Sequence, residues 1–86
     1  MRIKTSSGKE YGAGLVYALT RKGKAQIMLE LKGVSMGEAA TLDGEKTITM
    51  INESVPGAET TYTGYMRLMS IARTDGGVRV TLEREE

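Results

Sequence analysis

The feature that most constrains the fold is a strict alternation of apolar and polar residues over positions 78–83. Val78, Val80 and Leu82 occupy the apolar positions, and a period of two is that of a β-strand with one buried and one solvated face. The preceding Asp75-Gly76 supplies residues that tolerate the positive φ of a tight primed turn. The sequence therefore predicts a hairpin running from Thr60 to Glu83: a long strand, a turn at 74–77 and a shorter returning strand.

The long strand of this hairpin has an irregular pattern. Tyr62, Tyr65, Leu68 and Ile71 recur every three residues, a spacing that fits neither a flat strand nor a straight helix. A twisted strand with a bulge near Gly64 reconciles this spacing with the hairpin.

A second hairpin is predicted between Tyr11 and Lys32, with its turn at Arg21-Lys22-Gly23-Lys24. Its second strand, from Ala25 to Lys32, alternates cleanly, although its residues also have good helix propensity. We expect one face of this hairpin to be turned to the core, and glycines on its first strand to mark a bulge or a close backbone approach. The apolar residues are Leu15, Tyr17 and Leu19 on the first strand and Ala25, Ile27, Leu29 and Leu31 on the second, and the glycines are Gly12 and Gly14.

The remaining elements are short. Positions 1–4 alternate as a first strand, and Ser35 with Glu38 has the spacing of a capping box, which predicts one short helix near Ser35 to Leu42. Lys46 to Asn52 predicts a strand with Ile48 and Met50 directed inward, followed by an exposed loop over 52–58. The fold class is therefore mainly β: a single domain, residues 1–86, of about six antiparallel strands in a small barrel or sandwich with one short helix.

Composition excludes most familiar chemistry. The 86 residues contain neither Cys nor His, so thiol catalysis, thiolate metal sites and the commonest general base are missing. No motif selects a pair of carboxylates for acid–base work. We therefore expect no enzyme activity, no metal, no cofactor and no small-molecule substrate.

Short apolar runs and the absence of Cys predict a soluble protein of the reducing cytoplasm. Lys and Arg total 12 against 11 Asp and Glu, a balance that gives no general attraction for nucleic acid or an anionic membrane. The longest apolar-leaning run, from Ala13 to Leu19, is too short to cross a bilayer. The sequence lacks Phe and Trp and contains six Met, so oligomerisation is a natural way to add buried area.

One cluster is a candidate nucleic-acid site. Arg21, Lys22 and Lys24 on the basic turn can contact phosphates, with Tyr65, or Tyr17 in its place, as a surface on which a base stacks. The alternative interpretation is a solvated turn that discourages aggregation at a sheet edge, with the tyrosines packed in the core.

The C-terminal half resembles the ending of small proteins encoded in prophages and tailed phages of bacteria. The shared pattern is a Tyr, a Gly-Tyr, a Leu and an Ile on one strand, here in Thr61 to Ile71, then a turn and a Val-x-Val-x-Leu strand, here in Asp75 to Leu82. Ile3-Lys4-Thr5 and Gly8-Lys9-Glu10-Tyr11 are similar to the opening hairpin of that family, whereas Gly37 to Leu42 lacks the family's aromatic residue. The resemblance implies a β-rich structural or accessory component of a virion or tail.

Together these observations predict a non-enzymatic structural or assembly module that works through protein–protein contacts, with itself or with other chains. It would lie in the cytoplasm, or in the virion if it is of phage origin. The alternative hypothesis is a small β-barrel that binds nucleic acid.

Overall fold

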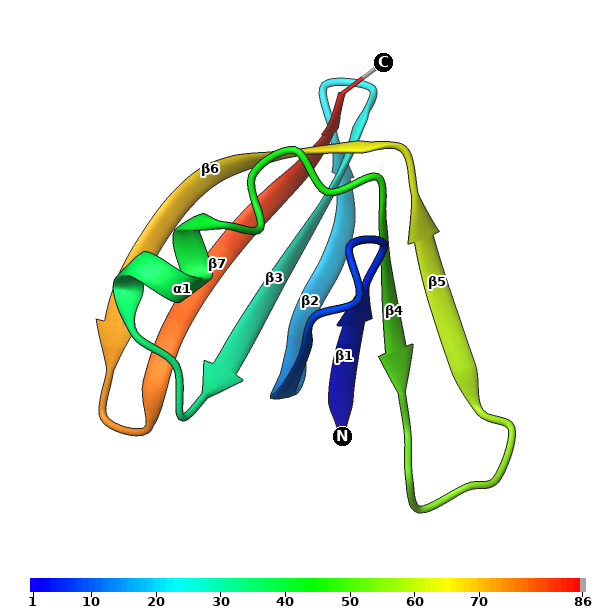
Figure 1. The fold of residues 1–86 in the computed structure, drawn as a ribbon. Coiled ribbons are helices and arrows are strands. Elements are labelled where there is room, and N and C mark those ends of the chain that lie inside the picture. Colours follow the sequence, from blue (N-terminus) through cyan, green and yellow to red (C-terminus); the bar gives the residue numbers. More distant parts are fainter. Residues whose placement is uncertain (86) are drawn as a thin grey trace.

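The fold is built on a single curled sheet. The computed structural model describes residues 1–85, without the side chains of Tyr65, Met66 and Glu85. Within these residues the backbone forms a seven-stranded antiparallel sheet and one short helix (Figure 1). The elements are β1 (Arg2–Thr5), β2 (Glu10–Arg21), β3 (Lys24–Lys32), α1 (Met36–Ala40), β4 (Thr47–Ile51), β5 (Glu59–Thr63), β6 (Tyr65–Thr74) and β7 (Gly77–Glu85).

The strand order is β5-β4-β1-β2-β3-β7-β6. Four of the neighbouring pairs are hairpins between consecutive strands, and the pairs β1–β4 and β3–β7 join distant parts of the chain. The predicted mainly β architecture with one short helix is confirmed. The sheet curls around its core without closing, because β5 and β6 form its two edges and are not paired with each other in the described part of the chain.

Gly64 divides the long strand that the sequence predicted from Thr60 onward. Its φ of 116° lies in a region that glycine enters freely and other residues avoid. At this corner the chain leaves β5, at one edge of the sheet, and starts β6, at the other edge (Figure 1). The prediction of one continuous strand was therefore wrong, and the division raises the strand count from about six to seven.

A bulge in β2 moves its apolar residues to different faces. Leu15 is opposite Leu29, but Tyr17 is opposite Met28, so Val16 is an extra residue in the ladder. Residues directly opposite in a ladder share a face, which places Leu15 on the inner face and Tyr17 on the outer face. Tyr17, and Leu19 two positions later, therefore do not share the core face with Leu15 as the sequence predicted. The bulge also lies beyond the glycines that were expected to mark it.

A second bulge explains the three-residue spacing in the C-terminal half. Leu68 is opposite Leu82 and Ile71 is opposite Val80, with the register shifting between Leu68 and Ser70. Leu68 and Ile71 thus both face inward although three positions separate them. The prediction of a bulge near Gly64 was therefore wrong in position: the bulge lies at Met69, and Gly64 forms the corner between β5 and β6.

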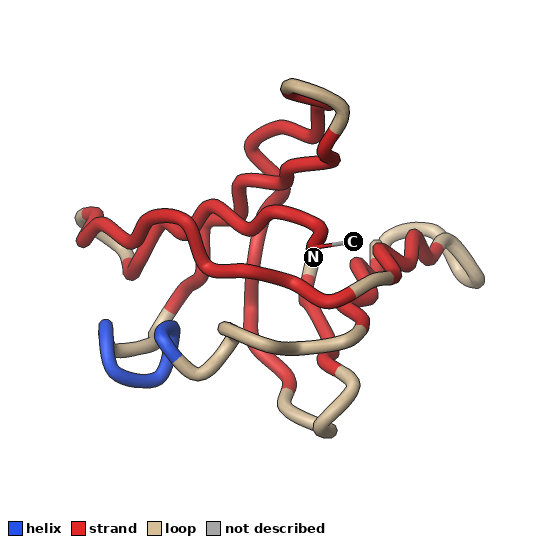
Figure 2. The backbone as a smooth tube through the Cα atoms, turned by 90° about the horizontal axis from the view of Figure 1, so that it is seen from above, coloured by secondary structure: helices blue, strands red, loops and turns tan. Residues whose placement is uncertain are grey.

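The core is the inner face of the sheet, and α1 and the segment that follows it lie along one side of the sheet (Figure 2) and contribute Ala39 and Leu42 to the core. The predicted capping box is present: Ser35 Oγ accepts from the backbone N–H of Glu38 at 3.1 Å, and Glu38 Oε1 accepts from the N–H of Ser35 at 3.4 Å. The helix packs against β6 and β7. The fully buried side chains include Ile3, Leu29, Leu31, Ala39, Leu42, Ile48, Val80 and Leu82.

The two long hairpins close through different turns. Lys22 and Gly23 have φ values of 51° and 80°, as a type I′ turn requires. Asp75 and Gly76 also form a two-residue loop, but neither has a positive φ. The hairpin at 75–76 is confirmed and its predicted primed turn is wrong, because Asp and Gly tolerate a positive φ without requiring it.

Replacing Lys22 with Asn should stabilise the protein by about 0.5–1 kcal/mol, since Asn enters the left-handed region more readily than Lys. Urea unfolding of the two proteins measures this difference. Lys24→Asn removes the same charge from a residue outside the central pair of the turn, and we expect no gain from it. An equal midpoint for wild type and Lys22→Asn would contradict the assignment of the turn.

Candidate functional site

The basic turn brings together the three predicted cationic residues. Arg21, Lys22 and Lys24 line one hollow of about 360 Å³ at the tip of the β2–β3 hairpin. The side chain of Tyr65, the fourth predicted residue, lies outside the described part of the structure. Three of the four residues are therefore positioned at one surface.

An acidic residue on β7 reduces the positive charge of this hollow. Lys24 Nζ lies 3.7 Å from Glu83 Oε1, and Gln26 Nε2 donates to Glu83 Oε2 at 2.7 Å. Among the described side chains, no acidic group lies within ion-pair distance of Arg21 or Lys22. Two cations thus remain for an anionic ligand.

An apolar strip on the outer face adjoins this hollow. Tyr17 is opposite Met28, and Leu19 is opposite Gln26, while Met69 lines the hollow itself. Leu19 is 42% exposed and Met69 is 46% exposed. Sequence reasoning missed this strip because the two bulges determine which of these side chains face outward.

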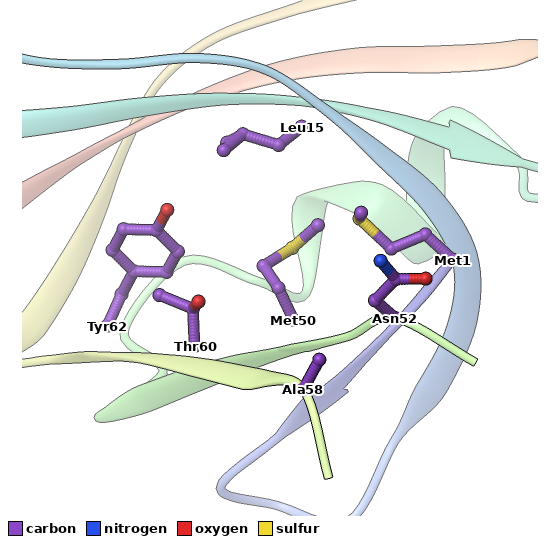
Figure 3. Close-up of a pocket in the computed structure, with 7 residues that line it drawn as sticks. All are labelled: Met1, Leu15, Met50, Asn52, Ala58, Thr60 and Tyr62. Carbon is purple, nitrogen blue, oxygen red and sulfur yellow. The ribbon is translucent and has the colours of Figure 1, made fainter. Parts of the chain in front are cut away.

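A second hollow lies on the inner side of the sheet, beside β5. Its volume is about 220 Å³, and in Figure 3 Leu15 of β2 faces Tyr62 of β5 and Met50 of β4 across open space. We call it the β5 groove. The residues that line it are Met1, Leu15, Met50, Asn52, Ala58, Thr60 and Tyr62.

The β5 strand presents free backbone groups beside this groove. Asn52 N–H donates to the carbonyl of Ala58 and Gly64 N–H donates to that of Lys46, both at 3.0 Å, which fixes the alternation of bonded pairs along β4–β5. The pairs Met50–Thr60 and Ile48–Tyr62 are therefore the bonded ones.

It follows that Glu59, Thr61 and Thr63 direct their N–H and C=O groups away from β4, toward the edge of the sheet. No strand in the described part of the chain pairs with that edge. Lys, Pro and bulges, which often block such edges, do not occur between Glu59 and Thr63. The short length of the strand and the charge of Glu59 at its start are the features that limit pairing here.

The β6 edge is protected, in contrast. The N–H of Leu68 donates to Asp43 Oδ1 at 2.9 Å, and α1 packs against the strand. The bulge at Met69 interrupts its regular ladder. Of the two edges of the sheet, β5 therefore offers the more regular row of backbone groups to a further strand.

Glu45 is the buried carboxylate among the described acidic residues, with 6% of its surface exposed. It accepts hydrogen bonds from Ser7 N–H at 3.2 Å and from Ser7 Oγ at 2.9 Å. These bonds fix the β1–β2 turn to the segment before β4, so Glu45 has a structural role.

Similarity to known proteins assigns no family or function to these surfaces. Comparisons with protein-family models, curated proteins and solved structures found no match. Among the described residues, no three acidic side chains gather as a metal site. The one helix of this part of the chain, α1, is too short to span a bilayer.

Proposed function

We propose that this protein is a non-enzymatic structural or assembly module that works by binding a further protein chain through β5, either a second copy of itself or a different protein. The observation that supports this function is the edge at Glu59, Thr61 and Thr63, which no strand of the described chain pairs with and which lies beside the apolar β5 groove. An extended segment placed on such an edge gains backbone hydrogen bonds, and its alternate side chains enter the adjoining groove. Edge and groove together favour strand addition as the binding mode.

We also propose a place for the module in a virion or phage tail, or in the cytoplasm where such particles assemble. This proposal depends on the resemblance of Thr61 to Ile71 and of Asp75 to Leu82 to small phage-encoded proteins. Many copies of a few chains pack side by side in such particles, and an exposed sheet edge suits that kind of assembly.

Site-specific photo-crosslinking in cells that encode the protein tests the function. A photoreactive residue in place of Thr63, on β5, should yield defined protein adducts, whereas the same residue in place of Arg79, within the sheet on β7, should not. Each captured chain must then form a complex of fixed stoichiometry with the purified protein by light scattering. Adducts that depend equally on both positions, or no stable complex, would contradict the proposal.

Nucleic-acid binding is the second candidate, favoured by the hollow that Arg21, Lys22 and Lys24 line. Because Glu83 is paired with Lys24, we expect about two phosphate contacts and a slope of roughly −1.8 in a plot of log K against log salt for duplex DNA.

Fluorescence anisotropy with labelled DNA measures that slope. The double variant Arg21→Gln, Lys22→Gln should lose nearly all binding, and Lys46→Gln, which removes a cation elsewhere, should bind as the wild type does. Failure of the wild type to retain single-stranded or duplex probes at low salt would exclude this candidate.

A further inference from the structure

We propose that the partner of β5 is a second copy of this chain, paired antiparallel through β5 about a two-fold axis at Thr61. This inference rests on the proposed function, because it names the occupant of the same edge. This pairing of β5 with β5 would join the two seven-stranded sheets into one continuous sheet.

The backbone groups of β5 match this arrangement. Glu59, Thr61 and Thr63 direct their N–H and C=O groups to the edge. With the axis at Thr61, each Thr61 is opposite the other Thr61, and each Glu59 is opposite Thr63 of the second copy. The Thr61–Thr61 pair and the two Glu59–Thr63 pairs are then hydrogen-bonded pairs, and every edge-directed N–H and C=O group of these residues gains a partner.

The side chains are compatible with the same register. On the outer face Thr61 meets Thr61, and Glu59 meets the hydroxyl of Thr63, so no like charges are directly opposite. Thr61 already contacts the hydroxyl of Thr49 at 3.2 Å, which confirms that its side chain lies on this face. The register is therefore self-complementary, as a two-fold interface requires.

The inner face gains a contact at the groove. Ladder pairing places Thr60 and Tyr62 inward, opposite Met50 and Ile48, and both line the β5 groove. In the proposed pair, Tyr62 lies opposite Thr60 of the second copy, an aromatic residue against a β-branched one. The two grooves then adjoin each other across the axis, and apolar surface is covered on both sides.

Assembly through β5 stops at two copies. Growth into a filament needs β5 of one copy to pair with β6 of the next, but Leu68 N–H is bonded to Asp43 and the ladder at Met69 is bulged. In the described part of the chain β5 is the edge with a regular ladder along its whole length. A symmetric β5–β5 pair uses this edge on both copies and leaves no β5 edge for growth. A second copy therefore suits this edge better than a filament contact does.

Sedimentation velocity over about 10 μM to about 1 mM measures the association. Strands of five residues form a small interface, so we expect a dissociation constant on the order of 100 μM. Thr61→Lys places two ammonium groups opposite each other at the axis and should weaken the dimer by roughly tenfold or more. Thr49→Lys adds the same charge to the same face and also removes the Thr49–Thr61 contact, but it lies one strand from the edge and should leave the dimer largely intact.

Urea midpoints establish that both variants are folded, and amide exchange of the wild type supplies a second measurement. Protection of Glu59, Thr61 and Thr63 should rise with protein concentration, whereas that of Thr60 and Tyr62 should not change. A wild type that is monomeric at the highest concentration, or equal effects of the two lysine variants, would overturn the inference. A wild type that stays monomeric but captures a different protein through Thr63 would overturn this inference alone. The absence of any adduct or complex that depends on β5, with a second copy included, would contradict the proposed function as well.

Discussion

Adding one methyl group at Gly77 should destabilise the protein by about 3 kcal/mol, because a Cβ at this position would overlap backbone atoms and not a movable side chain. Gly77 starts β7 opposite Lys32 of β3, and its Cβ would be directed at the carbonyl of Leu31. To make room, the β3–β7 pair would have to separate at the end where it carries buried Leu31 and Val78. Urea unfolding of Gly77→Ala measures the loss.

The neighbouring glycine is the matched control. A Cβ at Gly76 meets no atom within 4 Å, and Gly76 does not have a positive φ. Gly76→Ala should therefore change the free energy of unfolding by less than about 0.5 kcal/mol. Similar losses for the two variants would show that turn flexibility, and not close strand packing, is what glycine provides here.

Truncating Leu29 to Ala should cost about 3–4 kcal/mol. Leu29 is fully buried and lies between Leu15 and Val80 in the ladder, on the inner face at the middle of the sheet. The loss combines the transfer of the removed methyl groups with the cavity they leave. The unfolding free energy from urea titration gives the value.

Leu19→Ala tests whether the β2 bulge reverses the faces. If Leu19 faced the core, as simple alternation predicted, its truncation would cost as much as that of Leu29. It lies on the outer face and is 42% exposed, so the expected loss is below about 1 kcal/mol. A loss above 2 kcal/mol for Leu19→Ala would contradict the placement of the bulge.

Local patterns in the sequence predicted most of the elements. The alternation from Ala25 to Lys32 and from Val78 to Leu82 is confirmed as β3 and β7, and the Ser35–Glu38 capping box is confirmed at α1. In these two strands the apolar residues face the core along the element, so the period of two is visible in the sequence. The helix was predicted from its capping box. The interpretation of Ala25 to Lys32 as a helix is excluded.

Local patterns could not predict the order of the strands in the sheet, or which face the residues near each bulge lie on. An inserted residue such as Val16 or Met69 resembles any other strand residue, and only pairing with the neighbouring strand shows that it is extra. Gly64 was read as a possible bulge because its positive φ cannot be seen in the sequence. The β5 edge was missed for the same reason, since the strand was joined to β6 in the prediction.

The candidate basic site was predicted more fully than the groove. Arg21, Lys22 and Lys24 are adjacent in the sequence, so one turn necessarily brings them together. The β5 groove combines Met1, Leu15 and Tyr62 from three distant segments, and no local signal connects them.

The position of β7 affects how this protein is made. Although β7 follows all the other described strands in chain order, it lies between β3 and β6 in the sheet. A nascent chain therefore exposes one side of β3 until Gly77 to Glu85 has been synthesised. The three buried apolar residues of β7, Val78, Val80 and Leu82, can enter the core only after that. The β3–β7 pairing that completes the core is thus the last to become possible during synthesis, and folding of the whole sheet must wait for it.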